Sequence, residues 1–133
     1  MNPSYPLVAA RAGHRCEYCR APEVIFNFPF EVELIVPSSR DGADDEANLA
    51  LTCRACNLHK GSHLTALDDQ TESFVRFFDP RHDQWNEHFQ VATATGTMQG
   101  LTAIGRATVL RLRMNSEVQV AARRQWMRLG LYP

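Results

Sequence analysis

The amino-acid sequence predicts an α+β fold on the basis of three observations. Four cysteines form two Cys-x-x-Cys pairs, at residues 16–19 and 53–56. The chain between the pairs has the pattern of a strand, a loop and a second strand, and the second pair opens a short helix. Two amphipathic helices follow near the C-terminus. Because 133 residues is the size of one domain, we expect a single domain over residues 1–133.

The overall composition is that of an ordinary globular protein. Hydrophobic residues make up 44% of the chain and charged residues 22%, which excludes an intrinsically disordered protein. No apolar run reaches the roughly 18 residues of a membrane span, and the N-terminal segment lacks the apolar stretch of a signal peptide. We therefore expect a cytoplasmic protein with no membrane partner. Because that compartment is reducing, metal binding explains the cysteines better than disulfides do.

The first half of the chain contains the predicted strand, loop, strand and helix. A strand that Pro37 closes is predicted by alternation. The two alternating sets are Phe30, Val32 and Leu34, and Glu31, Glu33 and Ile35. Gly61 stands where a helix commonly ends. The expected elements are a helix from Ser4 to Gly13, a strand at 26–36, a polar loop at 38–48, a return strand at 48–52 and a helix at 54–60.

The second half is predicted to contain extended segments followed by two helices. The extended segments are 72–78 and 89–98, and the second turns at residues 95–97 as a hairpin. Thr102 and Ser116 are the expected N-caps, the latter forming a capping box with Gln119. The predicted apolar stripes are Ala103, Ala107, Leu110 and Met114 on the first helix, and Val118, Ala122, Trp126 and Leu129 on the second.

The cysteine spacing predicts a closed structural zinc site. Each pair offers two thiolates, and two pairs complete the tetrahedral shell of one Zn²⁺ at about 2.3 Å. The site leaves no open position for catalysis at that ion. The alternative, four unrelated buried or redox-active thiols, does not account for the doubled spacing. The predicted zinc ligands are Cys16, Cys19, Cys53 and Cys56.

These motifs resemble the zinc-containing, four-cysteine branch of small bacterial HNH endonucleases. The segments that carry the resemblance are 16–19, 30–37, 48–51 and 53–61, with a tail at 78–81, 85–89 and 101–106. The resemblance implies a ββα-metal core, also called a His-Me finger. It divides the chain into a zinc and HNH core at 14–63, extended segments and a hairpin at 64–100, and a basic two-helix extension at 101–130.

The resemblance also implies a divalent-metal-dependent DNA endonuclease that hydrolyses phosphodiester bonds. It assigns Glu33 and Asn57 to a catalytic Mg²⁺ or Mn²⁺, for which oxygen ligands are chemically suited. Asn48 then positions the loop, and Lys60 lies near the scissile phosphate. The presence of all four residues together favours either a recent loss of function or retained metal and DNA binding.

Leu34 occupies the position of the family's general-base histidine. Leucine accepts no proton, and general-base assistance is typically worth ~10²- to 10⁴-fold in rate, so we expect impaired activity. His59 and His63 are the candidate substitute bases. Three explanations stay open: an engineered inactivation, a natural pseudo-nuclease that still binds DNA, and a site that uses another base. The alternative function is a catalytically inactive, zinc-structured nucleic-acid-binding or regulatory module.

The distribution of charge predicts a contact for phosphates. The net charge is −1, but from residue 101 onward six arginines face one acid, which gives +5 there and −6 in the rest of the chain. The alternative is a solvated arginine face without a ligand. With the family resemblance, we expect double-stranded DNA bound with little sequence specificity. The predicted phosphate contacts are Lys60, Arg106, Arg113, Arg124 and Arg128.

Overall fold

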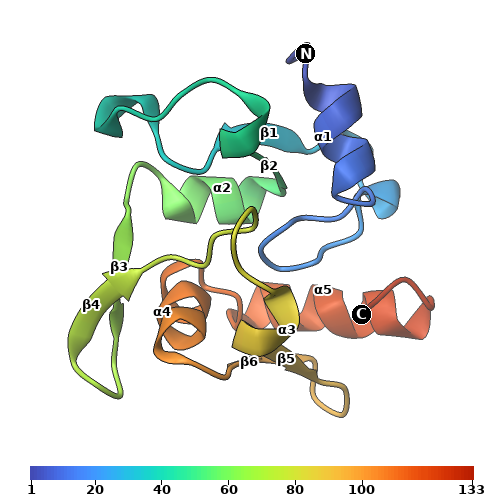
Figure 1. The fold of residues 1–133 in the computed structure, drawn as a ribbon. Coiled ribbons are helices and arrows are strands. Elements are labelled where there is room, and N and C mark those ends of the chain that lie inside the picture. The colour runs from blue at the N-terminus through green and yellow to red at the C-terminus, as the bar shows by residue number, and fades with distance from the viewer. The chain divides into compact units, whose positions relative to one another are not determined.

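The computed structural model describes residues 1–133 and divides them into two compact units, Met1–Ser62 and His63–Pro133 (Figure 1). The boundary lies within one residue of the predicted end of the core. Helices and small antiparallel sheets occur together, which confirms the predicted α+β class. The prediction of a single domain stays a prediction.

The first unit is built on the predicted succession of two strands and a helix. Strand β1 (Glu31–Leu34) pairs antiparallel with β2 (Leu49–Thr52), and α2 (Arg54–Lys60) follows directly. Helix α1 (Tyr5–Arg11) contacts both strands and buries its Val8 side chain. Figure 1 shows α1 and α2 next to the β1–β2 pair. The order strand, loop, strand, helix is therefore confirmed.

The first strand is shorter than predicted because its partner is short. In the ladder Glu31 lies opposite Thr52, and the next residue already caps α2. Residues before Glu31 thus have no strand to pair with. The chain there forms a 3₁₀ turn at Glu23–Ile25, and Phe28 is 78% exposed. Two more 3₁₀ turns, Ser38–Arg40 and Glu46–Asn48, shape the loop that joins the strands.

A buried carboxylate that the sequence analysis did not single out joins α1 to the start of β1. The Tyr5 hydroxyl donates to both oxygens of Glu23 at 2.9 Å, and the backbone N–H of Phe30 donates at 2.7 Å. His14 Nδ1 lies 2.8 Å from the same carboxylate. Glu23 thereby fixes the chain that enters β1.

The second unit contains two hairpins and three helices. Helix α4 contacts β3, β4 and β6, and Phe78 packs edge-on against Phe89 with ring centroids 5.1 Å apart. The elements are β3 (Thr65–Asp68), β4 (Ser73–Arg76), α3 (Trp85–His88), β5 (Phe89–Ala92), β6 (Thr97–Gly100), α4 (Ala103–Arg111) and α5 (Glu117–Arg128). The sequence analysis missed β3 and α3, which are only four residues long each.

Both predicted N-caps in this unit are confirmed. The Thr102 hydroxyl accepts from the N–H of Gly105 at 3.0 Å, and the Ser116 hydroxyl accepts from the N–H of Gln119 at 3.3 Å. The predicted hairpin turn at residues 95–97 is also present, since β5 and β6 flank it. Cap and turn signals are local, which is why the sequence shows them directly.

The predicted apolar stripes of the two C-terminal helices are only partly right. Leu110 is half exposed on α4, and on α5 Val118 is 77% exposed although Trp126 is buried. The inward position of α5 is instead taken by Arg123, whose guanidinium donates to the carbonyls of Gly96 and Met114 at 2.7 and 2.8 Å. A buried arginine with carbonyl partners replaces part of the apolar stripe.

None of the helices combines the length and the apolar composition of a membrane-spanning segment.

Candidate metal centre and catalytic cleft

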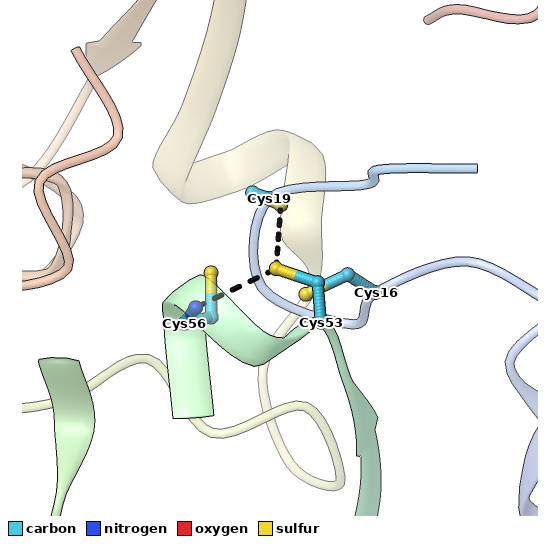
Figure 2. A group of neighbouring side chains, drawn as sticks. All are labelled: Cys16, Cys19, Cys53 and Cys56. Atoms are coloured by element: carbon cyan, nitrogen blue, oxygen red, sulfur yellow. Dashed lines mark hydrogen bonds between the residues drawn. The ribbon is translucent and has the colours of Figure 1, made fainter. Parts of the chain in front are cut away.

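The four cysteines gather into one buried cluster. Their Sγ atoms all lie within 4.8 Å of one another, and Figure 2 shows the sulfurs turned toward a common point. Cys19 Sγ and Cys53 Sγ are 3.7 Å apart. The ligands of a tetrahedral zinc with bonds of about 2.3 Å are about 3.8 Å from each other. The donor set and its spacing therefore fit one tetrahedral metal ion, as predicted.

Local backbone structure accounts for both halves of the cluster. In the first pair the chain turns back on itself, with the N–H of Arg20 donating to the Cys16 carbonyl at 2.9 Å and Arg20 at a positive φ of 68°. In the second pair Cys53 is the N-cap of α2, and its Sγ accepts from the N–H of Cys56 at 3.5 Å. One helical turn brings residues three apart to the same side.

A pair of hydrogen bonds ties the first cysteine turn to β2. The N–H of Glu17 donates to the Leu51 carbonyl at 2.9 Å, and the N–H of Leu51 donates to the Glu17 carboxylate at 2.9 Å. Because β2 leads into Cys53, these bonds bring the two pairs together.

The crowded thiols affect each other's ionisation. Hydrogen bonds from Cys16 and the other two thiols lower the pKa of Cys53, while hydrogen bonding with Cys16 and its neighbours raises the pKa of Cys56. One sulfur is thus favoured as a thiolate, and a divalent cation in place of the thiol protons stabilises the others as thiolates too.

The first unit also contains a cleft of about 670 Å³, lined entirely by residues of that unit. It contains three of the predicted site residues, Glu33, Leu34 and Asn57, together with Glu31. Asn48, His59 and Lys60 do not line it. The structure thus brings Leu34, the predicted general-base position, together with Asn57, while Asn48, His59 and Lys60 lie outside the cleft.

Glu33 is held in an internal network. The Tyr18 hydroxyl donates to Glu33 Oε1 at 2.6 Å, and Lys60 Nζ lies 3.7 Å from Oε2. Burial raises the pKa of Glu33 to about 7, against the opposing effects of Lys60 and Tyr18. Since Tyr18 lies between Cys16 and Cys19, this network connects β1 to the cysteine cluster.

Lys60 points into the protein. Its side chain is 2% exposed, and Nζ donates to the Ile35 carbonyl at 2.9 Å. A lysine buried in this way is paired inside the fold and does not offer its ammonium to a phosphate in solvent. The burial argues against the predicted phosphate contact and makes Lys60 a link between the end of α2 and the end of β1.

Glu31 is a cleft residue that the sequence analysis missed. Asn57 Nδ2 donates to Glu31 Oε2, and Arg54 Nη1 lies 3.4 Å from Glu31 Oε1. The available signal was strand periodicity, because residues two apart on β1 share one face. Glu31 and Glu33 therefore both face α2.

Asn48 acts on the loop, as the family resemblance implies. Its side chain accepts from the N–H of Val36 at 2.9 Å and donates to the carbonyls of Val36 and Ala43 at 2.9 and 2.8 Å. Gly42 lies so close to this clamp that a Cβ there would be 1.7 Å from the Val36 carbonyl oxygen. The loop thus depends on an asparagine and a glycine at fixed places.

The cleft contains no histidine. His59 follows Asn57 by two residues, which turns it about 200° around α2, and its buried Nδ1 has no hydrogen-bond partner. His63 belongs to the second unit, where it lines a groove with Arg111 and Arg113. Neither of the two candidate substitute bases, His59 and His63, therefore lines the cleft.

The predicted phosphate-binding arginines differ in availability. Arg106 donates to both oxygens of the buried Asp68 at 2.9 and 3.0 Å, and the Arg106 hydrogen bonds lower the pKa of that carboxyl. Its charge is thus neutralised within the second unit. Arg113, Arg124 and Arg128 are exposed, so their charges face solvent.

The profile of the HNH endonuclease family matches residues 16–63. The match runs from the first cysteine pair through β1, the loop and β2 to the end of α2. Residues 16–63 therefore match an HNH domain, and the family match does not extend to the rest of the chain. The match supports a nuclease-like function and nucleic acid as the partner. No curated protein and no solved structure matches the chain.

Removing the metal is expected to unfold at least residues 14–62. Zinc binding contributes about 10 to 16 kcal/mol in small zinc modules, and the apo cluster would leave crowded thiols in a small core. Circular dichroism and amide hydrogen exchange of chelator-treated protein measure this loss, with zinc re-addition as the control. Elemental analysis is expected to find one zinc per chain. Retained exchange protection in the first unit at well under one metal per chain would contradict the expectation.

The variant Gly42→Ala is expected to destabilise the protein by about 1 to 3 kcal/mol, because the new methyl group collides with the Val36 carbonyl. Urea denaturation measures the change. Gly13→Ala is the comparison variant: a Cβ at Gly13 meets nothing within 4 Å, so its cost comes from the positive φ alone and separates backbone strain from collision. A Gly42→Ala cost no larger than that of Gly13→Ala would show that the loop moves freely.

Glu33→Gln is expected to make stability less dependent on pH. The folded pKa of about 7 lies above the unfolded value of about 4.3, so the folded protein holds the extra proton and stability falls as pH rises between these values. The amide of the variant does not titrate. Relative to the parent, the variant should gain about 1 kcal/mol between pH 6 and pH 8 in zinc-saturated urea denaturation. A difference in unfolding free energy that stays constant from pH 6 to pH 8 would show that Glu33 does not titrate in this range.

Proposed function

We propose that the chain is a divalent-metal-dependent DNA endonuclease of the HNH type, with a hydrolytic activity impaired at Leu34. The observation that carries the proposal is the cleft itself, where β1 carboxylates and Asn57 lie beside the general-base position within an HNH segment. Zn²⁺ at the four cysteines stabilises the fold. Mg²⁺ or Mn²⁺ in the cleft serves the reaction, and the protein acts in the cytoplasm.

The cleft residues fit such a cation by the chemistry of their donors. The Asn57 amide and a carboxylate of β1 supply oxygen ligands, which Mg²⁺ and Mn²⁺ prefer. When bound, the cation supplies positive charge that stabilises the oxygen leaving phosphorus. Asn48 keeps the loop after β1 in place. Leu34 lines the cleft and takes no proton from an attacking water, which is the basis of the proposed impairment.

Double-stranded DNA is the proposed substrate, bound through its phosphates. The exposed Arg113, Arg124 and Arg128 supply positive charge for such contacts, and no helix is evident that would read base edges. We therefore propose little sequence specificity.

The second candidate function is a nucleic-acid-binding module without catalysis. Leu34 favours it, because an apolar side chain stands at the place of the general base and no histidine lines the cleft. Under this proposal the cleft binds metal and phosphate but does not cleave.

The deciding experiment compares the parent chain with Leu34→His in a supercoiled-plasmid nicking assay with Mg²⁺ or Mn²⁺. Restoring the base is expected to raise nicking at least about tenfold, a fraction of the usual general-base contribution. Leu34→Gln is the matched control, since it introduces a polar side chain of no basicity and should give no gain. Asn57→Ala in the Leu34→His background should return nicking to baseline.

Other outcomes separate the two functions. DNA binding by the parent chain with no nicking in either Leu34→His or the parent would favour the binding module. Strong nicking by the parent that Leu34→His leaves unchanged would mean that another base operates.

A further inference from the structure

We propose that Glu31, and not Glu33, supplies the carboxylate that holds the cleft cation together with Asn57. This inference rests on the proposed metal-dependent function and names the ligand pair of its site.

Glu31 is the carboxylate that meets Asn57 in the cleft. Its side chain is 38% exposed, it lines the cleft, and Oε2 accepts from Asn57 Nδ2. A half-turn of the Asn57 amide exchanges Nδ2 for Oδ1, since the two ends of the amide are nearly alike in size. The pair then presents two oxygens to the same point, which is the donor set of a hard divalent cation. Without the cation, the amide nitrogen donates to Glu31. With the cation bound, the amide oxygen is a ligand.

Glu33 is committed elsewhere. Its side chain is 6% exposed, Oε1 accepts from the Tyr18 hydroxyl at 2.6 Å, and Oε2 lies 3.7 Å from the Lys60 ammonium. A cation on Glu33 would share a buried carboxylate, which already accepts from Tyr18, with the Lys60 ammonium close by, and that positive charge repels it. The same network that positions β1 thus removes Glu33 from the ligand set.

Arg54 modulates the site. Its guanidinium is 3.4 Å from Glu31 Oε1, but the side chain is 85% exposed. An exposed pair of this kind contributes little stability and opens easily. Without the cation, Arg54 therefore neutralises the charge of Glu31. When the cation is present, Arg54 competes weakly with it for this carboxylate.

The test is a Mn²⁺ titration of the zinc-loaded full-length protein, followed by the electron paramagnetic resonance signal of free Mn²⁺. Mn²⁺ prefers oxygen to thiolate ligands, so the cysteine cluster does not bind it in competition with zinc. Glu31→Gln should weaken Mn²⁺ binding at least about tenfold, and Glu33→Gln should change it less than about threefold. Arg54→Gln should tighten binding about twofold, by removal of a competing charge.

Glu31→Asp provides a second variant, because it keeps the carboxylate and should recover part of the affinity that Glu31→Gln loses. Circular dichroism and zinc content confirm that each variant is folded. The proposal is overturned if Glu33→Gln weakens Mn²⁺ binding as much as Glu31→Gln does, or if Glu31→Gln has no effect.

Nicking by the Leu34→His protein separates this failure from that of the proposed function. Metal-dependent nicking that survives Glu31→Gln but not Asn57→Ala would overturn the Glu31 assignment and leave the endonuclease standing. If the Leu34→His protein neither binds Mn²⁺ nor nicks DNA, both the Glu31 assignment and the proposed endonuclease function are overturned.

Discussion

The first unit depends on the four-thiol cluster. Its sheet has two strands of four residues each, and an isolated two-stranded ladder is marginal in water. The cluster joins the turn after α1 to the junction of β2 with α2, so a metal ion held by the four sulfurs would close a long loop in the chain. Closing such a loop removes much of the conformational entropy that the unfolded chain would otherwise gain. A segment too small to be stabilised by apolar burial alone is thereby given a defined structure.

The cleft inherits its geometry from that cluster. One wall is β1, which the cluster reaches through the hydrogen bond from Tyr18 to Glu33. The other wall is α2, which begins at Cys53 and presents Asn57 one turn later. Lys60 closes the frame by joining the end of α2 to Ile35. Because both walls are attached to the same four sulfurs, the cleft residues keep their spacing without a large core between them.

Sequence predicted the features whose causes are local, and missed those that need a partner from elsewhere in the chain. Cysteine spacing, the caps Thr102 and Ser116, and the helix end at Gly61 depend on a few neighbouring residues, and all are present. The length of β1 depends on where β2 ends, which no pattern inside residues 26–36 reveals. Likewise Arg123 is buried because two distant carbonyls receive its guanidinium, although an arginine in a helix normally indicates a solvated face.

The internal partners of the family residues also change how strongly these residues indicate function. Their joint presence argues for retained activity only if each is free to be lost when catalysis is lost. Asn48 holds the loop through three hydrogen bonds. Inside the fold, Glu33 accepts from Tyr18 and Lys60 donates to the Ile35 carbonyl. All three residues would therefore be kept for stability in a protein that cleaves nothing. Leu34 fits the same scaffold, since it lies opposite the buried Leu49 in the ladder. The functional argument therefore comes down to Asn57 and Glu31, two polar side chains that face each other in the open cleft and whose pairing the fold alone does not require.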